Sequence, residues 1–184
     1  MQIIIGLGNP GPKYANTRHN AGWLALDYIA GSDNWKKEKK FNALVKEKPG
    51  YLYIKPLSFM NESGESAYKA MNFYKLIEKH FLGGTKKEQN LQDCLYVIQD
   101  DLDLDLGTWK ISQDSRSGGN KGIQSIISQL KTQKFTRLRL GIKTEALRNP
   151  LPADKFVLQR FGTNELDLLK QTMTKAIPAL EKLF

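Results

Sequence analysis

The sequence predicts an α/β protein, a single domain over residues 1–184 built as a three-layer α/β/α sandwich around a twisted mixed β-sheet. Two observations predict this class. Apolar stretches of strand length alternate with segments whose apolar residues recur at helical spacing. One pair of strand-like segments is joined by Lys48-Pro49-Gly50, a turn sequence typical of an antiparallel hairpin. A chain of 184 residues is long enough to bury a full core, and one domain is the usual expectation.

The first element is the apolar run 2–8, which is typical of a buried strand. Two prolines in the loop after it delay the next helix, because the residue before a proline is pushed out of the helical region. A helix is then expected over about 20–30, capped by Asn16 or Thr17 and ended by Gly31.

The alternation of strands and helices continues to the end of the chain. The lysine-rich segment 36–40 is expected to be a solvated surface. The other predicted elements are a hairpin over 41–47 and 51–55, a helix after Gly64 with apolar positions through Ile77, a surface loop over 82–92, strands over 94–98 and 107–112, a Gly-rich loop over 115–122, a helix carrying Ile123 to Leu130, a strand over 135–143, a loop over 147–155 and a last helix from 163 toward 183.

The balance of charges favours a polyanionic partner. There are 28 Lys and Arg against 19 Asp and Glu, a net charge of +9. Polar and apolar residues alternate over 135–143, which places Arg137, Arg139 and Lys143 on one face of a strand as a basic stripe.

Membrane and redox roles are not expected. No apolar run approaches the roughly 18 residues that span a bilayer, and Ile3-Ile4-Ile5 suits a strand better than a signal sequence, so the protein is expected to be cytoplasmic. The single cysteine, Cys94, excludes an intramolecular disulfide and adjoins an apolar strand, which indicates a core residue.

The segment Gly6-Leu7-Gly8-Asn9-Pro10-Gly11 has the spacing of a dinucleotide-binding turn. In that fingerprint the helix begins inside the motif, and an acidic residue about 20 positions later closes a second strand. Here Pro12 delays the helix, and the acid near that distance, Asp27, lies in a segment of helical spacing. No nucleotide cofactor is therefore expected.

His19 is the histidine that has other candidate catalytic groups around it. Asp100 could close a strand beside the one that leads to Asn9, and a carboxylate that holds one imidazole nitrogen leaves the other free to take a proton. Two alternatives stay open. His19 could be a structural hydrogen-bonding residue, and Asp100, Asp101 and Asp103 could cap turns or bind a hard cation.

Asparagines recur at the ends of strands and in loops. Singly, each is most often a turn or capping residue. Together with an imidazole they offer uncharged donors and acceptors able to hold a carbonyl group and a water molecule. These residues are Asn9, Asn20, Asn61 and Asn120.

Seven motifs occur in a fixed order over nearly the whole chain: Gly6-Leu7-Gly8-Asn9-Pro10-Gly11, Tyr14-x-x-Thr17-Arg18-His19-Asn20-Ala21-Gly22, Lys55-Pro56-x-x-Phe59-Met60-Asn61-x-Ser63-Gly64, Asp100-Asp101-Leu102-Asp103, Ser117-Gly118-Gly119-x-x-Gly122, Arg137-Leu138-Arg139-Leu140-Gly141-Ile142 and Phe156-Val157-Leu158. In these motifs and their order, the chain resembles the bacterial peptidyl-tRNA hydrolase family.

The resemblance implies hydrolysis of the ester between a peptide, or an N-blocked aminoacyl group, and the terminal ribose of tRNA, by a monomer without metal, cofactor or covalent intermediate. It implies that His19 is the general base and that Asp100 orients its ring. Asn9 and Asn61 would hold the peptide carbonyl and main chain. Further implied or candidate contacts are Tyr14, Met60 and Asn20 in the cleft, and Lys110, Lys121, Arg137 and Arg139 on tRNA phosphates.

The chain departs from the family pattern in two places. Where the family usually has Gly-Gly-His-Asn-Gly, residues 118–122 read Gly-Gly-Asn-Lys-Gly, so Lys121 stands at the usual asparagine. Asn120 could reach in from one residue earlier, or Lys121 could supply a cationic donor. Ser112 stands where some relatives carry a phosphate-binding lysine. The alternative function is a non-catalytic RNA-binding protein on the same fold, although a pure binder has no need to keep the base with its orienting acid.

Overall fold

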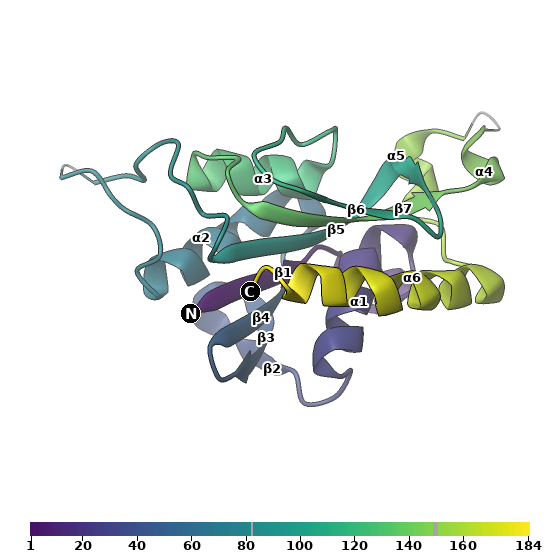
Figure 1. The fold of residues 1–184 in the computed structure, drawn as a ribbon, viewed down its shortest axis with the longest axis horizontal. Helices are drawn as coiled ribbons and strands as arrows, with labels where there is room; N and C mark the ends of the chain where they lie inside the picture. Colours follow the sequence, from purple (N-terminus) through teal and green to yellow (C-terminus); the bar gives the residue numbers. More distant parts are fainter. Residues whose placement is uncertain (82, 149–150) are drawn as a thin grey trace.

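In the computed structural model, seven strands form one mixed, twisted sheet with helices on both faces (Figure 1). The structure describes residues 1–81, 83–148 and 151–184. The strand order is β2-β3-β4-β1-β5-β7-β6. The predicted α/β class with a mixed sheet is confirmed.

The α-helices and strands have the following bounds: β1 (Gln2–Gly6), α1 (Ala21–Ala30), β2 (Lys36–Glu38), β3 (Ala43–Lys48), β4 (Tyr51–Pro56), α2 (Ser63–Phe73), β5 (Leu95–Asp105), β6 (Trp109–Ser112), α3 (Lys121–Leu130), β7 (Thr136–Lys143), α4 (Glu145–Arg148), α5 (Ala153–Phe156) and α6 (Thr163–Glu181). Four short 3-10 turns are η1 (Pro12–Tyr14), η2 (Arg18–Asn20), η3 (Lys39–Phe41) and η4 (Met60–Glu62).

The centre of the sheet is parallel and its two borders are antiparallel. β1 pairs in parallel with β4 and β5, and β5 pairs in parallel with β7. β3 is antiparallel to both β2 and β4, as expected for the hairpin, and β6 is antiparallel to β7. The carboxyl ends of β1, β4, β5 and β7 therefore meet at one edge, where open α/β sheets place their ligand sites. We call it the carboxyl edge.

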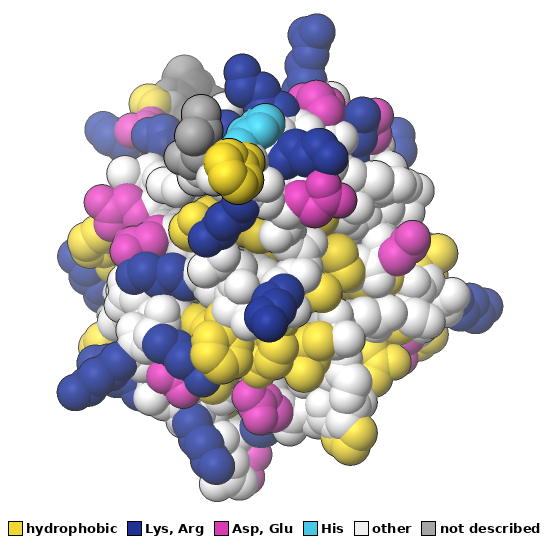
Figure 2. Space-filling model, turned by 90° about the vertical axis from the view of Figure 1, so that its left-hand side faces the viewer, with side chains coloured by type: hydrophobic (Ala, Val, Ile, Leu, Met, Phe, Trp, Pro, Cys, Tyr) yellow, Lys and Arg dark blue, Asp and Glu magenta, His cyan; other side chains and the backbone are white. Residues whose placement is uncertain are grey.

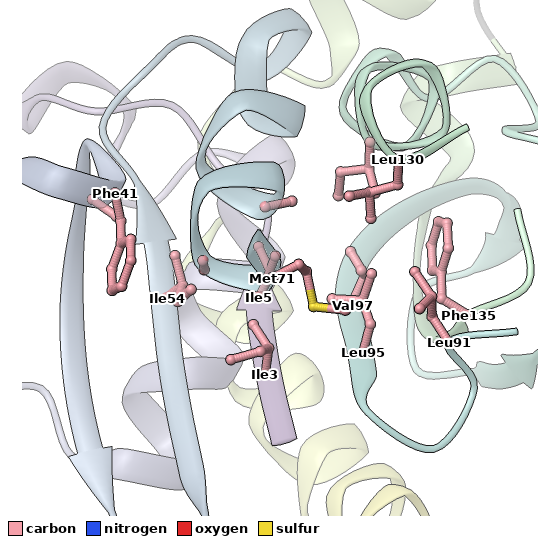
Figure 3. Packing of buried hydrophobic residues seen from close by; sticks show 14 of the residues in the cluster. Ile3, Ile5, Phe41, Ile54, Met71, Leu91, Leu95, Val97, Leu130 and Phe135 are labelled. Atoms are coloured by element: carbon pink, nitrogen blue, oxygen red, sulfur yellow. The ribbon is translucent and has the colours of Figure 1, made fainter. Parts of the chain in front are cut away.

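Each face of the sheet has its own apolar core. Alternate residues of β1 enter opposite cores, Ile3 and Ile5 on the side of α2 and α3, Ile4 on the side of α1 and α6. Figure 3 shows Met71 of α2 pointing toward Val97 of β5 in the first core. Cys94 packs against this core, as its sequence context predicts.

Helix α1 packs directly on β1 because two glycines let the backbones touch. A Cβ atom on Gly6 would lie 2.4 Å from the carbonyl oxygen of Gly22, and one on Gly22 would lie 2.3 Å from that of Ile98. Gly6, the first glycine of the segment with dinucleotide-binding spacing, is thus needed for the packing of α1 on β1. That segment does not form a nucleotide-binding turn, because α1 begins only at Ala21, well beyond Gly11.

Gly22→Ala should destabilise the fold by about 3 kcal/mol or more, since the added methyl group meets backbone atoms that cannot turn away. Urea unfolding followed by circular dichroism measures this loss. Gly162→Ala is the matched control, because the nearest atom to its Cβ would be Glu165 Oε2 at 3.7 Å; since Gly162 is the N-cap of α6, the change should cost no more than about 1 kcal/mol. A loss for Gly22→Ala no larger than that for Gly162→Ala would contradict the packing argument.

Three predicted boundaries are wrong. The segment 36–40 is exposed for the most part, as expected, but its first residues form edge strand β2. β5 extends to Asp105, so Asp100 lies inside a strand and not after it, because β7 continues to pair with it. α2 ends at Phe73, short of Ile77, which is buried without being helical.

Two predicted loops include residues that the structure does not describe. Leu82 of the loop over 82–92 lies outside the described residues, as do Asn149 and Pro150 of the loop over 147–155. The described part of the second segment contains the end of α4 and most of α5, so this prediction of a plain loop is wrong. Among the described residues, no helix is long and apolar enough to cross a membrane.

Candidate active site

A cleft of about 560 Å³ opens at the carboxyl edge of the sheet. Its walls come from the loop after β1, the turns η2 and η4, the end of β5, the Gly-rich loop before α3, and the segment around α5. The lining residues are Asn9, Tyr14, His19, Phe59, Met60, Asn61, Gln99, Asp100, Asp101, Leu102, Gly118, Gly119, Asn120, Lys121, Ala153, Asp154, Val157 and Leu158.

The predicted pair of imidazole and carboxylate is formed. His19 Nδ1 lies 2.8 Å from Asp100 Oδ2, and the exposed fractions of the two side chains are 13% and 3%. Because a carboxylate only accepts, Nδ1 carries the proton in the neutral ring, and Nε2 is left as an acceptor. The alternative that His19 is only structural does not explain why the ring lines the cleft.

Opposing influences set the pKa of His19. Burial lowers the pKa because it disfavours the charged ring, whereas the charge and the hydrogen bond of Asp100 raise it. The positive charge of Lys121 lowers it. The net result is a pKa raised above the ordinary 6.5, so the ring is neutral only toward the alkaline side of its usual range.

The turn that carries His19 is fixed to the segment after α5 and to α6. The His19 backbone N–H donates to the Val157 carbonyl at 2.8 Å. Next to it, buried Arg18 donates from Nη2 to both carboxylate oxygens of Glu165, at 2.7 and 2.9 Å. The Arg18 guanidinium also lies 4.5 Å from the ring centre of Phe156. This anchor restricts the position of the imidazole.

Asn9 is oriented by two neighbours. Its side-chain Oδ1 accepts from the Met60 backbone N–H at 2.9 Å, which directs the amide Nδ2 away from this contact. Its backbone N–H donates to Asn20 Oδ1 at 2.9 Å, and Asn20 Nδ2 donates back to the Asn9 carbonyl at 3.0 Å. Asn20 is fully buried and absent from the cleft lining. The prediction that Asn20 binds substrate is therefore wrong, and Asn20 positions Asn9.

Asn120 lines the cleft, but both ends of its amide are engaged. Oδ1 caps α3 by accepting from the backbone N–H groups of Gly122 and Ile123, at 3.0 and 3.1 Å. Nδ2 donates to Asp100 Oδ1 at 3.1 Å. Asn120 therefore holds the carboxylate that holds His19. The placement does not favour the idea that it reaches toward substrate from one residue earlier.

Lys121 is the first residue of α3 and is exposed at the wall of the cleft. It has no ion pair within the described part of the chain. Its positive charge lowers the pKa of His19, although the net pKa is raised. The lysine that stands at the family's usual asparagine position therefore places a cation in the same cleft as His19.

The other predicted cleft residues, Tyr14, Met60 and Asn61, all line the cleft. Phe59 was missed as a site residue although it stands in a quoted motif; it is 55% exposed and meets Tyr14 edge to face, with ring centres 6.4 Å apart. Leu158 on the opposite segment was missed as well. These two give the cleft an apolar rim.

The basic stripe on β7 is largely occupied within the protein. Arg137 is buried and donates from Nη2 to the Ser115 hydroxyl and the Arg116 carbonyl, and burial, together with the charge of Arg139, lowers its pKa to about 10. The prediction that Arg137 offers its charge to phosphates is therefore wrong. Arg139 is paired with Asp101, whereas Lys110 on β6 is exposed.

The acidic cluster does not form a cation site. Asp100 faces His19 and Asp101 faces Arg139, since successive strand residues point to opposite faces. Within residues 1–81, 83–148 and 151–184, no group of three or more His, Cys, Asp or Glu side chains could hold a metal ion.

The fold and the cleft together are those of an α/β protein whose candidate catalytic group is an imidazole held by a carboxylate at the carboxyl edge of the sheet. Among the described residues that line the cleft, none is a serine, threonine or cysteine that could act as a nucleophile beside His19. The sequence model of the family described as Peptidyl-tRNA hydrolase matches residues 3–184, and the chain belongs to this family.

Relatives and solved structures agree with this assignment. The Peptidyl-tRNA hydrolase of Brevibacillus brevis is 44% identical over 189 residues, which cover 97% of this chain and 89% of the relative. That of Mycoplasmoides gallisepticum is 40% identical over 177 residues, covering 96% and 87%. The crystal structure of peptidyl-tRNA hydrolase from Acinetobacter baumannii matches with a TM-score of 0.80 at 26% identity, covering 100% of this chain and 88% of that one.

Proposed function

We propose that this chain hydrolyses the ester between a peptide, or an N-blocked aminoacyl group, and the terminal ribose of tRNA, with His19 as the general base. Residues 1–184 would act as a single catalytic domain. The observation that carries the proposal is the 2.8 Å contact between His19 Nδ1 and Asp100 Oδ2 in the wall of an open cleft.

In the first step, His19 Nε2 takes a proton from water while the water oxygen attacks the ester carbonyl carbon. The carbonyl oxygen becomes an oxyanion, which Asn9 Nδ2 and the Lys121 ammonium would stabilise; both residues line the cleft. The tetrahedral intermediate then collapses, the bond to the ribose oxygen breaks, and the imidazolium returns its proton to that oxygen. The products are a free peptide carboxylic acid and a free tRNA hydroxyl.

General-base assistance of this kind is worth about 10²–10⁴ in rate, and an oxyanion donor about 10²–10³. An ester is already activated toward attack by water. These two effects therefore suffice without a covalent intermediate.

The rival reading, a non-catalytic RNA-binding protein, gains no support from the geometry. A binder has no use for a carboxylate that fixes the tautomer of an imidazole, nor for an asparagine that in turn holds the carboxylate. The deciding experiment measures release of the acyl group from N-blocked aminoacyl-tRNA. Binding of this substrate without turnover would leave only the RNA-binding function.

Activity should fall on acidification, because only the neutral ring can accept a proton. Since the pKa of His19 is raised, the acid limb of kcat/KM should have its midpoint above pH 6.5. Lys121→Gln removes a charge that lowers this pKa, so its midpoint should move to higher pH. Lys175→Gln on α6, exposed and outside the cleft, is the control and should keep the wild-type midpoint. A rate that is flat between about pH 5 and 8, with binding intact, would remove His19 from the base role.

We further propose that the protein acts as a monomer in the cytoplasm, where charged tRNA is used. The support for a monomer is that all the catalytic groups come from one chain. Lys110 and Arg139 remain proposed phosphate contacts, and size-exclusion chromatography with light scattering tests the oligomeric state.

A further inference from the structure

A buried ion pair joins the turn that carries His19 to the last helix. On the surface shown in Figure 2, basic and acidic side chains are intermingled, and ion pairs between exposed charges contribute little to stability. The pair between Arg18 and Glu165 is of a different kind, because the two side chains are only 5% and 27% exposed. Nη2 of Arg18 donates to both oxygens of the carboxylate, so two bonds hold the guanidinium in place.

The buried guanidinium of Arg18 depends on this one carboxylate. Its Nε and Nη1 atoms are buried and have no hydrogen-bond partner among the described residues. Two aromatic rings flank it, since the guanidinium carbon lies 4.5 Å from the ring centre of Phe156 and 5.2 Å from that of Phe161. A buried charge that loses its partner is strongly unfavourable. Arg18 is therefore confined to the position from which Nη2 reaches Glu165.

Glu165 is itself fixed at the start of α6. It is the third residue of the helix, and its Oε2 accepts from the Gly162 backbone N–H at 2.8 Å, which closes a capping box. The helix is 19 residues long, and its side chains Leu169 and Met173 are buried in the core on the side of α1. The carboxylate that holds Arg18 therefore stands on the end of a long, firmly packed helix.

Arg18 and His19 are neighbours whose side chains have separate supports. They belong to the 3-10 turn η2, in which successive side chains point about 120° apart. His19 is held by Asp100 on β5, whereas Arg18 is held by Glu165 on α6. The backbone N–H groups of both residues donate to carbonyl groups of the segment 157–159. A shift of Arg18 therefore turns the short η2 segment and moves the imidazole relative to Asp100 and the cleft.

We propose that Glu165 is a positioning residue for the general-base step, although it is not one of the described residues that line the cleft. It acts through Arg18, and the pair keeps η2 where Nε2 of His19 meets the attacking water. A displacement of about 1 Å at the reacting atoms, caused by a substitution far from them, can cost about 10²-fold in rate. This inference rests on the proposed function and adds a residue of the last helix to the groups on which the rate depends.

The test separates positioning from stability. Glu165→Gln keeps the cap of α6, since glutamine also serves at this position, but it leaves the Arg18 charge buried without its partner. The paired variant, Arg18→Met with Glu165→Gln, removes both charges and places an apolar side chain between the two phenylalanine rings. Glu65→Gln is the matched control, because Glu65 is likewise the third residue of a helix, α2, is paired with Lys69, and is not among the described residues of the cleft wall.

Each protein is assayed by urea unfolding and by hydrolysis of N-blocked aminoacyl-tRNA, and the paired variant is also made in the His19→Ala background. We expect Glu165→Gln to lower the urea midpoint and to lower kcat by about 10–100-fold, with KM within about twofold of the wild type. The paired variant should recover the urea midpoint but not kcat. In the His19→Ala background it should leave the residual rate unchanged, because the base that the pair positions is absent. The control should match the wild type throughout.

A paired variant that recovers kcat together with its urea midpoint would overturn the inference, since the ion pair would then serve stability only. So would an equal fold loss in the wild-type and His19→Ala backgrounds, because the effect would then reach the reaction by a route other than His19. A folded Glu165→Gln protein with the wild-type kcat would overturn it as well. A wild-type protein that fails to hydrolyse the tRNA ester would instead contradict the proposed function.

Discussion

We expect His19→Ala to lower kcat by about 10²–10⁴-fold while leaving KM for N-blocked aminoacyl-tRNA nearly unchanged. Among the described residues of the cleft wall, His19 alone is both basic near neutral pH and held by a carboxylate, and the substitution removes it. Single-turnover release of labelled acyl group from the tRNA measures the effect on the chemical step.

His80 provides the matched control for this experiment, since it is exposed and lies outside the cleft. His80→Ala should keep the wild-type rate. His19→Ala leaves one oxygen of the buried Asp100 carboxylate without its partner and could lower stability. Urea unfolding of His19→Ala, compared with the double variant that also carries Asp100→Asn, measures this loss. A folded His19→Ala protein with full activity would contradict the general-base mechanism.

The second large effect is expected for Asp100→Asn, which should lower kcat by about 100-fold or more. An amide in this position can donate to Nδ1 and so stabilise the tautomer that carries its proton on Nε2. In that tautomer Nε2 cannot accept the proton of the attacking water. Removing the charge and hydrogen bond that raise the pKa of His19 should also move the acid limb to lower pH, the direction opposite to Lys121→Gln. A pH-rate profile measures both changes.

Asp103→Asn is the control for this substitution. Asp103 is on the same strand, is exposed, and is not among the residues that line the cleft. Its pH-rate profile should be that of the wild type. If Asp100→Asn lowered the rate without shifting the acid limb, Asp100 would not be the group that sets the pKa of the imidazole.

Sequence reasoning located this candidate pair because His19 lies shortly after one apolar run of strand length and Asp100 shortly after another, although β5 itself continues past Asp100. The chain between His19 and Asp100 contains three strands, yet both lie at the carboxyl edge, since parallel pairing brings the ends of β1 and β5 together. Local pattern and topology rules suffice for such residues. They do not require knowledge of side-chain contacts.

Roles that depend on long-range contacts were not predictable in the same way. The alternation on β7 put Arg137 and Arg139 on one face, but it could not tell that Ser115 and Arg116 would engage the Arg137 guanidinium. Asn20 belongs to a motif with His19, but its amide turns inward to Asn9. The strand β2 was missed because a lysine-rich segment has no apolar pattern and is held by its neighbour alone.

The contact between Arg18 and Glu165 joins residues 147 positions apart in the chain. During synthesis on a ribosome, every strand of the sheet and the whole cleft wall are made before Glu165. Until that carboxylate is made, the guanidinium next to His19 lacks its ion-pair partner, and the turn is held by its contacts with the segment 156–159. The ion pair that helps to anchor the turn of His19 is therefore completed last, when the final helix is made.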